Sequence, residues 1–139
     1  MTRVIRFVSV ILAVFGCSAM QGGPDLITDR TAEVEIEASH SAYIDAVHVR
    51  RIDGTTEITG RVRSKPPPRM TFPGHISISI IAADEKLVDT REVPYELRFR
   101  PRKPMRVGTF RAVLPYDIKS GTRVRLAFHH GFLKRAHRE

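Results

Sequence analysis

The chain has 139 residues and a formal net charge of +8, and 27% of its residues are charged. Its single cysteine excludes a disulfide within the chain and any cluster of cysteine ligands of the zinc-finger kind. A chain of this length forms about one domain, which must be stabilised by an ordinary apolar core.

The N-terminus has the pattern of a secretory signal. Arg3 and Arg6 precede nine uncharged, mostly apolar residues, Phe7–Phe15, and small residues follow. A basic start, a short apolar run and small residues are typical of an export signal. The run is too short to cross a bilayer as a helix, which takes about 20 residues. We therefore expect the protein to be exported.

The end of this signal, VFGC at 14–17, resembles the lipobox of bacterial lipoproteins. The resemblance implies that residues 1–16 are removed as a signal peptide and that Cys17 is lipidated. Two or more acyl chains anchor a protein stably, whereas one holds it only marginally. Because Ser18 stands where an Asp would favour the inner membrane, the resemblance implies an outer-membrane lipoprotein facing the periplasm. The alternative is ordinary cleavage after Ala19.

Residues 17–30 are expected to form a flexible tether behind the lipidated cysteine, because Gly22, Gly23 and Pro24 interrupt any periodicity. A tether of this length spans about 20 Å. From residue 31 onward apolar and polar residues alternate, as in half-buried strands. In the first strand Val34 and Ile36 are expected inside. Three glutamates face solvent, where a cation or the basic half of the chain are candidate partners: Glu33, Glu35 and Glu37.

A hairpin is predicted around Asp53-Gly54, a dipeptide typical of a type I′ turn. Gly60 in its second strand indicates a bulge or a close backbone approach. The residues of this hairpin that are expected to face the core are Val47, Val49, Ile58 and Val62. Four later segments alternate in the same way, with these core residues: Ile76, Ile78, Ile80, Tyr95, Leu97, Phe99, Phe110, Ala112, Leu114, Val124, Leu126 and Phe128.

Seven or eight short strands with Gly and Pro turns predict an all-β, antiparallel sandwich of two sheets over residues 31–130. At this size we favour an immunoglobulin-like arrangement. The strand pattern loosely resembles the FxLYD-type immunoglobulin-like modules of bacterial lipoproteins. Residues 131–139 are expected to form a basic C-terminal tail.

The sequence holds no pattern that supports catalysis or a bound cofactor. There is no G-x-S-x-G elbow, and the adjacent His129 and His130 would point to opposite faces of a strand. We therefore predict a protein that is not an enzyme and that has no metal ligands. An alternative enzyme would need a deep pocket that joins His48, His75 and distant carboxylates.

The charge is unevenly distributed, and the basic half of the chain, residues 91–139, suggests an anionic partner. The export signal argues against nucleic acid and for a component of the cell envelope. Arginine matches carboxylate and phosphate with two parallel hydrogen bonds. The predicted binding surface follows one strand and its loop, with Arg111, Arg123 and Arg125 as an extension: Arg91, Arg98, Arg100, Arg102, Lys103 and Arg106.

The sequence thus predicts a lipid-anchored, non-enzymatic envelope protein that binds an anionic partner through a basic strand face. One alternative is a soluble periplasmic metal-binding or inhibitor-type protein. Another is a structural accessory subunit of an envelope complex, which would expose an apolar patch around Met70 and Phe72.

Overall fold

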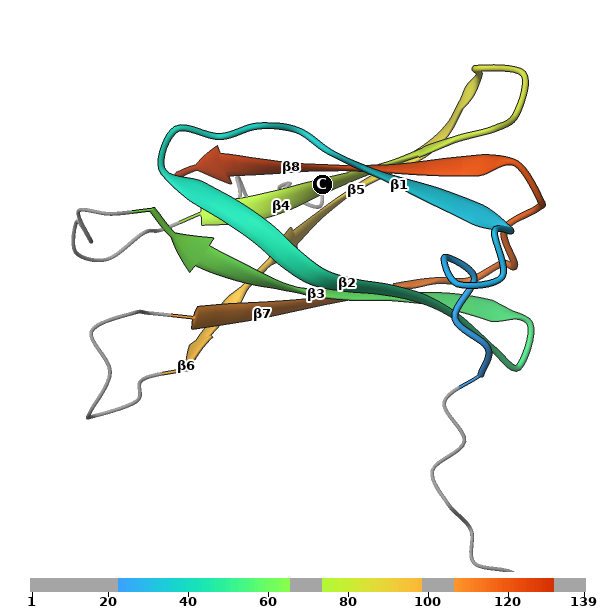
Figure 1. Ribbon diagram of the computed structural model, residues 1–139, viewed down its shortest axis with the longest axis horizontal. Helices are drawn as coiled ribbons and strands as arrows, with labels where there is room; N and C mark the ends of the chain where they lie inside the picture. Colours follow the sequence, from blue (N-terminus) through green and yellow to red (C-terminus); the bar gives the residue numbers. More distant parts are fainter. Residues whose placement is uncertain (1–22, 66–73, 99–106, 132–139) are drawn as a thin grey trace, which may run out of the picture.

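The computed structural model describes residues 23–65, 74–98 and 107–131, and in these ranges the chain forms eight strands in two sheets (Figure 1). Sheet A has the order β2-β3-β7-β6 and sheet B has the order β1-β8-β4-β5. The strands are β1 (Ala32–Ile36), β2 (Ala42–Ile52), β3 (Thr55–Ser64), β4 (Gly74–Ile81), β5 (Leu87–Pro94), β6 (Glu96–Arg98), β7 (Val107–Leu114) and β8 (Thr122–His130). The all-β, two-sheet prediction is confirmed. Among the described residues no helix is long and apolar enough to span a bilayer.

The predicted hairpin is formed by β2 and β3. Its turn has positive φ at both central residues, 48° at Asp53 and 76° at Gly54, as a type I′ turn requires. The bulge in this hairpin lies in β2, where the register shifts between Asp45 and His48. Gly60 instead marks a close approach, because a Cβ there would lie 2.5 Å from the ring of Phe110.

The core lies between the two sheets and contains nearly all the residues predicted from the alternation. Fully buried side chains come from both sheets: Val49, Ile58, Ile76, Ile78, Leu114, Val124 and Leu126 are all 0% exposed. The buried hydroxyl of Thr56 is satisfied, because it accepts a hydrogen bond from the amide of Ile118 at 3.2 Å. The alternation that buries Ile76, Ile78 and Ile80 would place Ile81 on the solvent face, but Ile81 is buried, and the register of β4 and β5 shifts just before it.

The prediction of a wholly antiparallel sandwich is wrong at one position, since β1 pairs with β8 in parallel. Ala32 lies opposite Thr122 and Ile36 lies opposite Leu126. The strand is anchored at its start, where Ala32 is buried, but Ile36 is 44% exposed although it lies opposite the buried Leu126, so it is not buried as expected. A strand at the edge of a sheet has core on fewer sides, which explains why alternation overestimated its burial.

The tether does not extend to Arg30, as the sequence suggested. Asp25 forms a β-bridge with Arg50 of β2, and the amide of Leu26 donates to the carbonyl of Val49 at 2.7 Å. Leu26 is completely buried and belongs to the core. One leucine in a polar segment carries no periodic signal, so its docking could not be read from the sequence.

Several predictions fall outside the described residues. These concern the signal segment with Cys17, the apolar pair Met70 and Phe72, the inward position of Phe99, and the tail from residue 132 onward.

Candidate binding groove on the outer face of sheet A

The predicted arginine surface is divided between the two sheets. Arg91 belongs to β5 in sheet B, whereas Arg98 belongs to β6 in sheet A. The other four predicted residues, Arg100, Arg102, Lys103 and Arg106, lie outside the described ranges. The strand that was predicted to carry these arginines is interrupted at Tyr95, where the chain passes from sheet B to sheet A.

Arg91 also faces differently from the prediction. It lies opposite Ile78, which is fully buried, so it projects from the core-facing side of β5 at the edge of the sandwich. Its Nε donates to Asp89 at 3.1 Å, and the hydroxyl of Tyr116 donates to the same carboxylate at 2.9 Å. Inward charges of this kind protect an edge strand from pairing with another chain.

This cluster shifts two pKa values. The hydrogen bond from Tyr116 is the largest cause that lowers the pKa of Asp89. Burial, followed by the hydrogen bond to Asp89, raises the pKa of Tyr116 to about 12. The cluster therefore holds a neutral phenol and an ionised carboxylate over most of the pH range.

A hollow of about 730 Å³ lies on the outer face of sheet A. Residues that pair across adjacent antiparallel strands point to the same face. His48 pairs with Thr59, and Thr59 pairs with Arg111, so three strands contribute one row of side chains. Arg61 and Thr109 form the next row. The residues that line this groove are Ala46, His48, Thr59, Gly60, Arg61, Pro94, Thr109, Phe110 and Arg111.

The bulge in β2 helps to shape the groove. Ala46 adopts a φ of 48°, a left-handed conformation that is unfavourable for an alanine. Bulges re-aim the side chains beside them, and strained backbone is concentrated at functional sites. Here the bulge places His48 in register with Thr59.

His48 is oriented by Asp25, whose Oδ2 lies 2.8 Å from Nδ1 of the imidazole. A carboxylate accepts a hydrogen bond from the protonated Nδ1, so Nε2 is the nitrogen left to face solvent. Burial by itself raises the pKa of Asp25, but hydrogen bonds from His48 and from the backbone of Ile27 and Val49 outweigh it and lower the pKa. Asp25 is therefore a stable anion that fixes the tautomer of His48.

The two groove arginines are held by carboxylates at its margin. Arg61 donates from Nε to Asp45 at 2.9 Å, and Arg111 contacts Glu57 at 2.6 Å. The side chains of Arg61 and Arg111 remain 44% and 69% exposed. A guanidinium has five N–H donors, so each retains donors for a ligand. Arg63 also contacts Asp45, at 2.9 Å, which leaves two arginines on one carboxylate.

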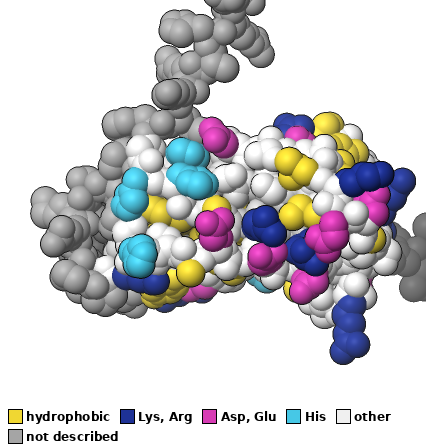
Figure 2. All heavy atoms as spheres, turned by 90° about the horizontal axis from the view of Figure 1, so that it is seen from above, with side chains coloured by type: hydrophobic (Ala, Val, Ile, Leu, Met, Phe, Trp, Pro, Cys, Tyr) yellow, Lys and Arg dark blue, Asp and Glu magenta, His cyan; other side chains and the backbone are white. Residues whose placement is uncertain are grey.

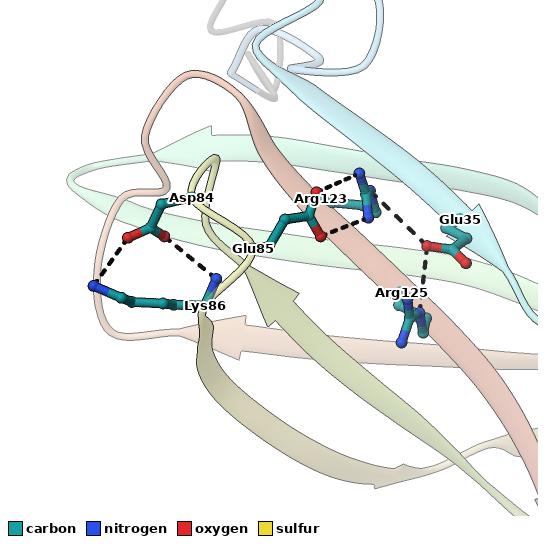
Figure 3. Close-up of polar contacts among 6 residues, drawn as sticks. All are labelled: Glu35, Asp84, Glu85, Lys86, Arg123 and Arg125. Atoms are coloured by element: carbon teal, nitrogen blue, oxygen red, sulfur yellow. Dashed lines mark hydrogen bonds and ion pairs between the residues drawn. The ribbon is translucent and has the colours of Figure 1, made fainter.

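The predicted extension onto Arg123 and Arg125 is neutralised within sheet B (Figure 3). Glu85 holds Arg123 through two hydrogen bonds of 3.0 and 3.2 Å. Glu35 lies 3.3 Å from Arg125 and 3.9 Å from Arg123. The sequence left two candidate partners for the glutamates of the first strand, a cation or the basic half of the chain. Glu35 forms ion pairs with two arginines of the basic half.

Two of the histidines considered for a site lie far apart in the fold. His48 lies on sheet A and His75 lies on sheet B, so the structure does not bring together the pair that the enzyme alternative required. His130 hydrogen-bonds the hydroxyl of Ser41. Among the described residues, no three or more His, Cys, Asp or Glu side chains are placed to hold a metal ion.

Sequence reasoning missed most of this groove. Asp25 was assigned to the tether, and Arg61 and Thr59 looked like ordinary solvent-facing residues of a hairpin. Arg111 was named only as an extension of another surface. The register across three strands brings them together, and a bulge that no sequence signal marked sets that register.

Comparison of the chain with protein-family models, with curated proteins and with solved structures finds no match.

Proposed function

We propose that the protein is a lipid-anchored, non-enzymatic binding module of the bacterial cell envelope that contacts phosphate-bearing lipid headgroups through the groove of sheet A. The observation that carries this proposal is the convergence of His48, Arg61 and Arg111 on one exposed hollow. Arg61 and Arg111 take the place of the arginines predicted from the sequence as the binding residues. The proposed chemistry, recognition of an anion by guanidinium groups, is unchanged.

The groove suits a phosphate group. Arg61 and Arg111 offer planar forks that match phosphate oxygens with paired hydrogen bonds. Thr59 and Thr109 add hydroxyl donors between the two guanidinium groups. His48 offers its outward-facing Nε2 to the ligand as a further hydrogen-bonding atom.

The entry of the chain supports a membrane-facing orientation of sheet A. The first described residues run along the outer edge of this sheet, where Asp25 bridges Arg50 (Figure 1). If Cys17 carries the lipid, five residues separate it from Gly23, and the six steps along the chain span at most about 22 Å. Because residues 25–30 are docked, this tether is shorter than the sequence suggested, and the groove lies closer to the anchoring membrane.

The strand order also supports an immunoglobulin-like fold. The order β2-β3-β7-β6 corresponds to strands A-B-E-D of an immunoglobulin domain, and β8-β4-β5 corresponds to F-C-C′. In this correspondence β1 lies where strand G would lie, next to F, but it comes from the N-terminal side and runs parallel. We propose an immunoglobulin-like sandwich whose last strand position is filled by its first strand.

Binding to vesicles tests the groove. The full chain with Cys17→Ser, which prevents lipidation, is sedimented with phosphatidylglycerol vesicles and, separately, with phosphatidylcholine vesicles. We expect salt-sensitive binding to the anionic vesicles that is lost in the double variant Arg61→Glu and Arg111→Glu. The matched control, Lys86→Glu with Lys119→Glu, makes the same change in net charge at exposed loop positions and should retain binding.

Two outcomes would contradict the groove. Unchanged binding by the Arg61 and Arg111 variant would show that the groove is not the contact surface. An equal loss in the lysine control would show that net charge alone, and not a shaped site, attracts the protein to the membrane.

The anchor needs a separate test. The intact mass of the protein extracted from membranes should equal residues 17–139 plus acyl chains, and a Cys17→Ala variant should lack them. A native protein that begins at Met20 without lipid would contradict the anchor.

A further inference from the structure

The groove of sheet A contains a side chain that recognition of phosphate alone does not explain. Nδ1 of His48 lies 2.8 Å from Oδ2 of Asp25. A carboxylate offers only acceptors, so Nδ1 carries a hydrogen whether the imidazole is neutral or charged. Nε2 is then the ring nitrogen that a ligand can meet, and the side chain of His48 is 45% exposed.

A hydroxyl group suits Nε2 in either state of the ring. A neutral imidazole with its hydrogen on Nδ1 presents a lone pair at Nε2, whereas a charged imidazole presents an N–H there. A phosphate oxygen without a hydrogen is matched only by the N–H. A hydroxyl both donates and accepts, so it pairs with Nε2 in both cases. The preference for an alcohol therefore does not depend on the charge of His48.

The register of the strands places His48 beside the cationic part of the groove. Arg61 and Arg111 lie at diagonal positions on the neighbouring strands β3 and β7, and Thr59 and Thr109 occupy the other diagonal. His48 lies on the third strand, β2, opposite Thr59. Neighbouring strands are about 4.8 Å apart, and a three-carbon alcohol reaches about one such step beyond its phosphate. A phosphate held by the two guanidinium groups would thus bring its alcohol to the imidazole.

The size and lining of the groove also suit a headgroup larger than phosphate. The hollow has a volume of about 730 Å³, which lies in the range of sites for small molecules and exceeds what one phosphate fills. Ala46 and Pro94 line it together with the polar side chains. Their apolar surface can pack against the carbon atoms that join a phosphate to its hydroxyl groups.

The opposite face of the sandwich uses the same residue types differently. Seen from the side of sheet B, histidine side chains gather over one end of the face, and clusters of acidic and basic side chains lie over the other (Figure 2). Arg123 and Arg125 of this face are paired with carboxylates. On sheet A, by contrast, one hollow is lined by a histidine and two arginines. A histidine of sheet B therefore serves as a comparison for His48.

We propose that the groove prefers phosphodiester headgroups that carry a free hydroxyl, such as that of glycerol, and that His48 binds this hydroxyl. The inference rests on the proposed function, because it takes phosphate recognition by Arg61 and Arg111 as given. It adds a specificity, since lipids of equal charge should differ in affinity according to whether their headgroup carries an alcohol. Asp25 is then a positioning residue, which holds the imidazole without touching the ligand.

A pair of lipids of equal charge tests the role of the hydroxyl. Phosphatidylglycerol and phosphatidylmethanol are both singly charged phosphodiesters, and only the first has free hydroxyl groups. Vesicles of each lipid are titrated with the full chain carrying Cys17→Ser. We expect the parent to prefer phosphatidylglycerol about three- to tenfold, which corresponds to one net hydrogen bond. His48→Ala should lose most of this preference.

The matched control is His129→Ala, at an exposed position of β8 on the other sheet, and it should keep the preference. The comparison of the two lipids in the parent needs no variant, so the test stays valid if His48→Ala is less stable. Equal affinity of the parent for both anionic vesicles would overturn the hydroxyl inference and leave phosphate recognition standing. A preference that persists in His48→Ala would overturn the role of His48. Binding of the parent to neither vesicle would refute the proposed function, and this inference with it.

Discussion

The outer faces of the two sheets repeat one arrangement with different results. On sheet A, Asp45 of β2 contacts Arg61 and Arg63 of β3. On sheet B, Glu35 of β1 contacts Arg123 and Arg125 of β8 (Figure 3). In each case one carboxylate on an edge strand lies against two arginines spaced two residues apart on the neighbouring strand.

The difference lies in what else surrounds the arginines. On sheet B, Glu85 takes both Nη groups of Arg123, so two carboxylates serve two arginines. On sheet A, Asp45 is the one carboxylate of the described residues that forms an ion pair with Arg61 and Arg63, and Arg61 lines a hollow. A balanced cluster fastens a strand to its sheet, whereas a cluster with surplus positive charge can also hold an external anion. The same pattern is therefore structural on one face and available for binding on the other.

The largest expected effect concerns the shape of the groove. Gly60→Val would force a side chain into the ring of Phe110, since even a Cβ would lie 2.5 Å from it. Overpacking of this kind costs about 1–3 kcal/mol. Urea unfolding should show this decrease in the free energy of unfolding. Binding to vesicles, measured without urea, should also fall. Thr90→Val, at an exposed position of β5 outside the groove, is the control. Equal stability of Gly60→Val and the parent would show that Phe110 is not fixed there.

The second effect concerns how β1 is fastened. Glu35→Gln should lower the free energy of unfolding by about 1 kcal/mol, because Arg123 and Arg125 lose their shared carboxylate. The loss should shrink in 1 M salt, where ion pairs are screened. Glu33→Gln in the same strand is the comparison. If the two variants are equally stable at low salt, Glu35 does not fasten the strand.

The third effect separates the two faces most directly. Asp45→Asn should increase affinity for phosphatidylglycerol vesicles a few-fold, because each cationic residue near an anionic surface contributes about 1 kcal/mol and one opposing charge is removed. Stability should change less than in Glu35→Gln, since β2 and β3 remain joined by a hairpin. A lower affinity for vesicles would mean that Asp45 orients Arg61 for binding.

The smallest effect appears at alkaline pH, at the edge strand that holds Arg91. The pKa of Tyr116 is about 12 in the folded protein and near 10 in an unfolded chain. A raised pKa gives stability that is complete below pH 10 and is lost as the pH rises toward 12. Chemical unfolding between pH 9 and 12 should therefore show a smaller decline for Tyr116→Phe than for the parent. If the free energy of unfolding falls equally with pH in the parent and in Tyr116→Phe, ionisation of Tyr116 does not contribute to the loss of stability.

The sequence predicted the strands well and the site poorly, for physical reasons. Alternation reports which face of a strand is buried, and it located Ile58, Ile76 and Leu126 correctly. Pairing partners depend on contacts between distant segments, so the parallel position of β1 had no local signal. The groove needs the register of three strands and a bulge, and Arg91 and Arg98 were separated because the chain changes sheet at Tyr95.

The parallel pairing of β1 and β8 also has a consequence for how the chain acquires its structure. Ala32 and Thr122 pair across 90 residues of sequence, so the first strand has no partner until nearly the whole described chain is available. Pairings of such long range close late and slow the folding of β proteins. During that interval the β8 side of sheet B presents an open edge, which is a template for association with other chains. A newly synthesised molecule would therefore be most vulnerable to aggregation just before its N-terminal strand docks.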